Sequence, residues 1–134
     1  MRTEWEGVRK NQKKVRAAIT VIGAGGPIGA VSLITRPEGL ADLCHSFVLV
    51  LAYSVLQESL EALLNEKHFE SSSRQLGALM VNSKKKIKWG NFLLVDEGRK
   101  RRNDIAHEAA ILSRERCQEY VNAIEDELKG WKIL

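Results

Sequence analysis

The sequence predicts an all-α protein, a four- to five-helix up-and-down bundle that forms a single domain over residues 1–134. Apolar residues recur at steps of three and four along most of the chain, which is the period of an amphipathic helix. The only two prolines, Pro27 and Pro37, lie in the first third, so every segment after Leu40 can continue as helix. The breaks between these segments are short, and short connections join antiparallel helices.

The first helix is predicted over Thr3–Ile22, with a polar, basic front and an apolar back. Six of its apolar residues can share one face: Trp5, Val8, Val15, Ala18, Ile19 and Ile22. The next segment, Gly23–Gly39, holds both prolines and five glycines, so we expect an irregular connection there. The tryptophans near the two chain ends, Trp5 and Trp131, are expected to pin those ends to the bundle.

A long helix is predicted over Leu40–Lys67, and its middle is apolar nearly all round, so it should be covered on several sides. A third helix, Ser72–Ser83, has candidate N-caps at Ser71–Ser73 and is followed by lysines that suit its negative C-terminal end. After a short apolar piece at Phe92–Val95, the last helix is predicted over Asn103–Lys129.

Composition narrows the class of protein only slightly. The chain is 44% hydrophobic and 28% charged, as ordinary soluble proteins are, and its net charge of +4 suits a polyanionic partner without selecting one. Cys44 and Cys117 lie far apart in apolar contexts and are expected to be reduced packing residues. The sequence has no metal-ligand spacing, so neither a metal nor a cofactor is expected.

We expect a cytoplasmic location and no membrane association. The most apolar run, Phe47–Tyr53, is far shorter than the roughly 20 apolar residues that a membrane span needs. The first residues, MRTEWEGVRKNQKK, include acidic side chains and no apolar stretch behind a short basic head, unlike a secretory signal.

A glycine pattern in the first third resembles a nucleotide-binding loop but lacks its continuation. Gly23, Gly26 and Gly29 have the GxxGxxG spacing that lets a backbone approach a pyrophosphate. A dinucleotide-binding unit also needs a helix and then a second parallel strand. Arg36–Pro37 interrupts the required helix, and a long amphipathic helix follows instead of a strand. An ordinary connector is therefore the favoured interpretation.

The most informative segment is EGRKRRNDIAHEAAIL, residues 97–112, which contains the spacing R-x4-H at Arg102 and His107. Asn103 or Asp104 can cap the predicted last helix, and Ile105 can face the core. This placement predicts that the guanidinium and the imidazole converge near the N-terminus of a helix, which itself attracts phosphate.

Arg-Asn-x-x-Ala-His at the opening of a last long helix, after the segment Trp89–Gly98, resembles the signature of the HEPN superfamily. The resemblance covers most of the chain from Leu40 onward, and Gly23–Gly39 has no counterpart. It implies a helical bundle that dimerises and brings two R-x4-H motifs into one cleft. It also implies a metal-independent endoribonuclease, often a toxin with an antitoxin protein as its partner.

These residue types suit RNA cleavage by the 2′-hydroxyl group. His107 can move a proton near neutral pH, and Arg102 can hold the phosphate and stabilise charge on its oxygens. Asn103 can bond the phosphate or orient the histidine, and a second copy would supply the second acid/base group. The chain departs from the family at Ala109, because several toxins carry there a tyrosine that the antitoxin modifies. Regulation by modification at that position is therefore excluded.

Two basic clusters flank Trp89 and form a candidate RNA-binding track: Lys84, Lys85, Lys86 and Lys88 before it, and Arg99 and Arg101 after it. Trp89 is then available for base stacking. The alternative is that the lysines are solvated helix ends and that Trp89 belongs to the core. Of the other two histidines, His45 is expected to be a packing or interface residue and His68 to be exposed.

A second function from another class remains open at this point. Some HEPN proteins keep the fold and only bind ligands or partners, so the chain is alternatively a non-catalytic binding or regulatory module. In that case Arg102 and His107 are solvated or hold the end of a helix.

Overall fold

The computed structural model describes the backbone of residues 2–23, 37–108 and 111–134 and the side chains of 2–13, 42–108 and 111–134. The described chain forms α-helices and no strand, which confirms the all-α prediction. The helices are α1 (Arg2–Gly23), α3 (Pro37–Asn65), α4 (Leu76–Ser83), α5 (Phe92–Glu108) and α6 (Arg114–Gly130).

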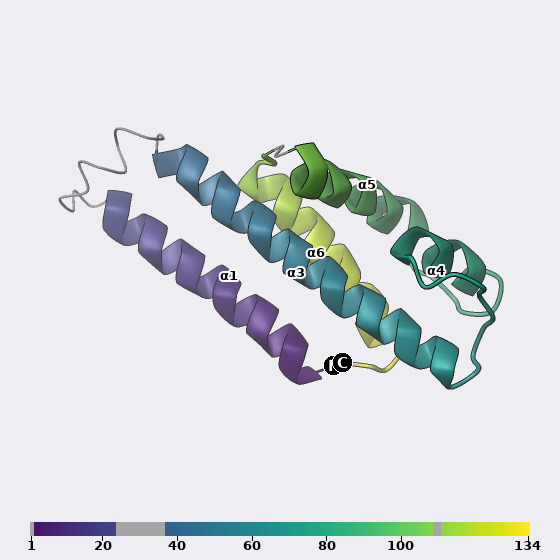
Figure 1. The fold of residues 1–134 in the computed structure, drawn as a ribbon. Coiled ribbons are helices and arrows are strands. Elements are labelled where there is room, and N and C mark those ends of the chain that lie inside the picture. Colours follow the sequence, from purple (N-terminus) through teal and green to yellow (C-terminus); the bar gives the residue numbers. More distant parts are fainter. Residues whose placement is uncertain (1, 24–36, 109–110) are drawn as a thin grey trace.

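Helix α3 occupies the centre of the bundle and contacts each of the other described helices. Helices α1, α3 and α6 lie side by side, α5 packs against α3 and α6, and α4 sits at one end (Figure 1). Successive long helices alternate in direction, so α3 and α6 are parallel and end at the same end of the molecule (Figure 1). This is the up-and-down order that the short connections predicted.

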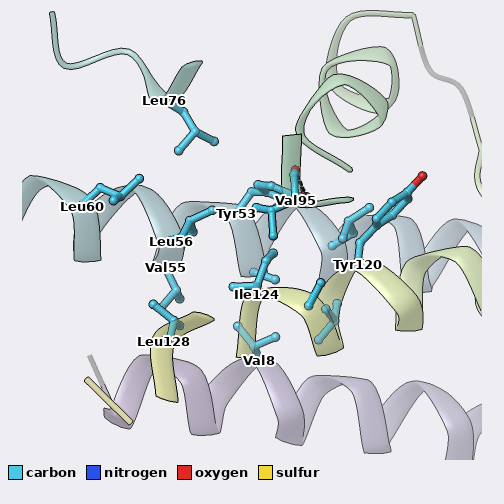
Figure 2. Close-up of a cluster of buried hydrophobic side chains, with 14 of the residues drawn as sticks. Val8, Tyr53, Val55, Leu56, Leu60, Leu76, Val95, Tyr120, Ile124 and Leu128 are labelled. Carbon is cyan, nitrogen blue, oxygen red and sulfur yellow. Dashed lines mark hydrogen bonds between the residues drawn. The ribbon is translucent and has the colours of Figure 1, made fainter. Parts of the chain in front are cut away.

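The core is built around two tyrosines that face α5 (Figure 2). Tyr53 of α3 and Tyr120 of α6 are fully buried, and the Tyr53 hydroxyl donates a 2.7 Å hydrogen bond to the Val95 carbonyl. Gly98 allows this close approach, because a Cβ atom there would collide with the Tyr53 hydroxyl and lie 2.8 Å from the Tyr120 ring. Helix α5 can therefore pack directly against the two tyrosine rings, because Gly98 has no side chain.

One described stretch, Asp42–Asn65 of α3, is long and apolar enough by composition to cross a membrane, although its central apolar run is short. The core helix of a bundle has the same properties. In this bundle all the other described helices contact α3. Packing against several neighbours therefore accounts for apolar residues on more than one side of α3.

The predicted last helix, Asn103–Lys129, is wrong because two helices occupy this part of the chain. Helix α5 ends at Glu108, and α6 begins at Arg114 after Ser113, whose side chain accepts a hydrogen bond from the Arg116 amide. Residues 109 and 110 lie outside the described structure. Asn103 therefore lies inside α5 and caps no helix, and the R-x4-H motif occupies the last turns of α5 instead of the beginning of a helix.

The break between α5 and α6 is held by polar contacts with α3. The Leu112 amide donates to the Ser46 hydroxyl at 3.1 Å, and the Arg114 amide donates to the Asp42 carboxylate at 2.9 Å. The apolar residues on either side, Ile105 and Cys117, both face the core. The apolar pattern therefore runs across the break, which is why the pattern predicts one continuous helix.

Three other boundaries differ from the predictions. Helix α4 begins after Gln75, which makes no side-chain cap, while Ser71 and Ser73 bond within the preceding turn. The apolar piece Phe92–Val95 is the first turn of α5 and not a separate element. Of Gly23–Gly39, Gly23 ends α1 and residues 37–39 open α3. Gly26, Gly29 and Arg36 of the glycine pattern lie outside the described residues.

Candidate active site on helix α5

Arg102 lies on the side of α5 that faces the bundle. The buried residues of this helix are Val95, Gly98 and Ile105, and Arg102 falls in the same stripe at steps of three and four. Its side chain is half-buried, with the guanidinium carbon 6.0 Å from the centre of the Tyr53 ring. The Arg102 Nε atom is buried and donates no hydrogen bond to any described residue.

Burial is the main influence on the Arg102 guanidinium. Loss of solvent lowers its pKa below the usual value, the Tyr53 phenol acts in the opposite direction, and the nearby Arg99 lowers it further. An arginine starts from so high a pKa that the group stays charged near neutral pH. Arg102 therefore presents a partly desolvated cation at the edge of the core, where a single phosphate would be bound more strongly than in open water.

His107 lies on the outer side of the same helix. It is exposed in the last turn of α5, and Asn103 lies one turn before it. Positions five residues apart on an α-helix differ by about 140° around the axis and about 7.5 Å along it. The structure thus brings Asn103 and His107 onto one face and places Arg102 on another, so the predicted convergence of Arg102 and His107 within one chain is wrong.

The helix end beside His107 is the negative one. The carbonyl groups at the C-terminus of a helix carry partial negative charge, which does not attract phosphate. The end of α5 itself therefore does not give the expected help of a helix N-terminus. On this helix the positive charge comes from the side chains of the basic segment Arg99–Arg102.

Three cations of this segment lie in ion pairs: the half-buried Arg99 and the exposed Lys100 and Arg101. The Arg99 Nε atom donates to Asp96 at 2.9 Å, and Lys100 lies 3.6 Å from the same carboxylate. Arg101 lies 3.6 Å from Asp104. Pairs of this kind are worth about 1 kcal/mol or less, so a phosphate can compete for these cations.

The lysine cluster before Trp89 is solvent-exposed, but the Trp89 ring is already packed against other aromatic rings. Lys84, Lys85, Lys86 and Lys88 are all exposed. The Trp89 ring packs edge-on against Phe92 and Trp131, with ring centroids 5.2 Å and 4.7 Å away, and its Nε1 atom donates to the Ser83 hydroxyl. The alternative interpretation of Trp89 as a packing residue therefore fits the structure better than base stacking.

The remaining predicted residues lie where simple packing arguments placed them. Trp5 is buried, and the Trp131 indole donates to the Lys88 carbonyl, so both tryptophans pin the chain ends as predicted. His45 is buried in α3, and His68 is exposed beside Glu66. Cys117 is buried and Cys44 half-buried, and both are free thiols. Burial raises the pKa of the Cys117 thiol to about 11.

Glu127 is a structural residue that the sequence analysis missed. Its side chain is 4% exposed, and its two carboxylate oxygens accept hydrogen bonds from the Gly90 and Asn91 amides at 2.8 and 2.6 Å. The carboxylate of α6 thereby fixes the turn that opens α5. A signal was present, because Glu127 falls among apolar residues in the buried stripe of α6, and a carboxylate in that position needs partners.

No protein-family model, curated protein sequence or solved structure matches this chain.

Proposed function

We propose that this protein is a metal-independent endoribonuclease that cleaves single-stranded RNA. On this proposal it acts in the cytoplasm as a toxin of a toxin–antitoxin, stress or phage-defence system. The observation that carries the proposal is the exposed His107 imidazole one turn from Asn103, on the open face of α5, within a segment that resembles the HEPN signature. A proton-transfer group at an accessible surface is the minimum that this reaction needs.

In the proposed reaction His107 removes the proton of a ribose 2′-hydroxyl group. The 2′-oxygen attacks the adjacent phosphorus, and the bond from phosphorus to the 5′-oxygen of the next nucleotide breaks. A second imidazole protonates that leaving oxygen. The products are a 2′,3′-cyclic phosphate and a 5′-hydroxyl end. Arg102 stabilises the charge on the phosphate oxygens, and Asn103 orients the phosphate or the imidazole.

The proposed site requires two copies of the chain. One copy offers a single exposed imidazole on α5, and its Arg102 lies on another side of the helix. A twofold pair can set the guanidinium of one copy beside the imidazole of the other. Apolar side chains for such a contact are present on α3, where Phe47 and Leu51 lie one turn apart and are 57% and 44% exposed.

The first test measures cleavage of a labelled single-stranded RNA by the purified protein in EDTA. We expect products with 2′,3′-cyclic phosphate ends, and no cleavage of the DNA oligonucleotide of the same sequence. His107→Ala should abolish cleavage, whereas His68→Ala, which removes the other exposed histidine, should still cleave the RNA and leave the same ends. Full activity of His107→Ala, or dependence on a divalent metal, would refute the proposal.

A mixing experiment tests whether the site is shared between copies. His107→Ala is expected to be inactive alone. Because the proposed reaction uses the imidazoles of both copies, wild-type/His107→Ala mixed dimers should also be inactive, and an equimolar exchanged mixture should keep roughly a quarter of the rate of the same total amount of wild-type protein. Half of that rate or more in dimers shown to have exchanged would mean that one imidazole is enough.

A second function, a non-catalytic binding or regulatory module, is favoured by one observation. Arg102 rests half-buried against Tyr53, which is also what a purely structural arginine would do. On this alternative Arg102→Ala weakens folding, RNA stays intact under every condition of the first test, and His107→Ala changes nothing.

A further inference from the structure

A groove lies at the end of the bundle opposite the end of α5 that carries His107. Its volume is about 470 Å³, and it lies where α3 and α6 finish. Four half-buried apolar residues form its floor, namely Leu63, Ile87, Trp131 and Ile133, and two exposed lysines, Lys86 and Lys132, lie at its rim. Glu66 and His68, which lie 3.2 Å apart, complete the lining. An apolar slot with cations at its rim has the character of a nucleotide subsite.

Lys132 is held at this rim by an unfavourable backbone conformation. Its φ angle is 60°, and it follows α6 in the position where glycine usually ends a helix. The Ile133 amide donates to the Leu128 carbonyl at 2.9 Å, which closes the turn. A side chain costs free energy in this conformation relative to glycine, so Lys132 can be replaced by glycine without backbone strain.

The segments around the groove are basic. Glu66–Glu70, Lys84–Lys88 and Trp131–Ile133 contain six lysines and two glutamates. Two of these lysines, Lys86 and Lys132, line the groove together with one carboxylate, that of Glu66. Two helix C-termini add partial negative charge here, so a phosphate would be attracted by the lysine side chains alone.

We propose that this groove binds one nucleotide of a single-stranded RNA, with the base on the apolar floor and the phosphate between Lys86 and Lys132. The choice of RNA as ligand rests on the proposed function. Helix α5 separates the groove from His107 by on the order of 20 Å. The groove therefore holds the strand several nucleotides away from the bond that is cut. Trp131, rather than Trp89, is the indole that meets the base.

The test compares two identical substitutions at two equivalent helix ends. Lys67 follows α3 with φ 64°, as Lys132 follows α6, but Lys67 does not line the groove. Glycine is favoured in both conformations, so Lys132→Gly and Lys67→Gly should both keep or raise the melting temperature. Affinity for a fluorescent single-stranded RNA is measured by anisotropy in EDTA, with His107→Ala as the background so that the RNA stays intact.

We expect Lys132→Gly to weaken binding roughly tenfold, as loss of a charged hydrogen bond does. The slope of log affinity against log salt should fall by about 0.7, the value for one phosphate contact on a single strand. Lys67→Gly should bind within about twofold of the background protein. Unchanged affinity in Lys132→Gly, or an equal loss in Lys67→Gly, would overturn the proposal.

Two competitors test the base contact and the class of ligand. An unlabelled single strand should compete well, whereas heparin, a polyanion without bases, should compete more weakly at equal charge. Equal competition by heparin, or binding of anionic phosphatidylserine vesicles that depends on Lys132 while RNA binding does not, would refute a nucleotide subsite. Because the His107→Ala background does not cleave RNA, this binding assay can fail or succeed independently of the cleavage test.

Discussion

Gly98 is the residue at which α5 comes closest to the rest of the bundle. Its missing side chain leaves room for the Tyr53 hydroxyl group and for the Tyr120 ring. The hydrogen bond from Tyr53 to the Val95 carbonyl forms in the same place. The position of Arg102, one turn further along the same stripe, depends on this contact, because both residues lie on the inward side of α5.

Gly98→Ala should therefore destabilise the protein. The added methyl group collides with Tyr53 and Tyr120, and overpacking of this kind costs about 1 to 3 kcal/mol, more than the helix propensity gained. Gly7→Ala is the matched control, since nothing lies within 4 Å of a Cβ atom there in α1. Urea unfolding should show a loss in the first variant and a gain of up to about 1 kcal/mol in the second. Equal effects would contradict the packing that we describe.

The arrangement of the candidate-site residues was not predictable from the sequence pattern. His107 is exposed, and Arg102 lies where a phosphate-binding side chain can be partly desolvated. They lie five positions apart on one helix, so they point to different sides. With the last helix predicted to begin at Asn103, Arg102 would lie outside its first turn, where this restriction does not apply. The error in one helix boundary thus became an error in the geometry of the site.

At the scale of the elements, Glu127 joins the end of α6 to the beginning of α5. The buried carboxylate accepts from the Gly90 and Asn91 amides, and the Asn91 side chain in turn accepts from the Leu94 amide in the first turn of α5. The start of α5 is therefore set by a residue that lies more than thirty positions later in the chain. The far end of the same helix carries His107.

Glu127→Gln should lower the free energy of unfolding by about 1 to 3 kcal/mol. The amide keeps one acceptor oxygen and turns an NH2 group toward a backbone amide that needs an acceptor. The neighbouring Asp126 is exposed, so Asp126→Asn should change stability by no more than about 0.5 kcal/mol. Both changes are measured by urea unfolding. If Glu127→Gln behaves like Asp126→Asn, the carboxylate does not hold the turn.

The helices themselves were largely predictable, because each has an apolar stripe of helical period. Helices α1 and α3 match their predictions to within a few residues. The division of the last predicted helix into α5 and α6 was not predictable from the apolar pattern, because Ile105 and Cys117 on either side of the break both face the core. Ser113, which caps α6, was the local signal, but neither glycine nor proline stands beside it.

At the scale of the whole molecule, stability should fall at alkaline pH. Burial holds the pKa of the Cys117 thiol at about 11 in the folded state, against an ordinary value of 9.0. The folded protein therefore keeps this proton where the unfolded chain loses it. The stabilisation is complete below pH 9.0 and disappears as pH rises through about 11. Burial likewise raises the pKa of Tyr53, which acts in the same direction.

The contribution of Cys117 is isolated by comparing wild-type protein with Cys117→Ala. Between pH 9.0 and about 11 the wild-type free energy of unfolding should decline by about 2 kcal/mol more than that of the variant. Urea titrations at fixed ionic strength measure the difference. Parallel pH profiles would show that this thiol is solvated in the folded state.

The central place of α3 also determines the order in which the molecule opens. Every other described helix packs against α3. Helix α4 is short and packs mainly against α3 and α5. Fluctuations that detach α4 leave the rest of the packing intact, but exposure of the amides around Tyr53 requires several helices to separate together. Backbone amides in the middle of α3 should therefore exchange with deuterium only through global unfolding, while those of α4 exchange through local openings.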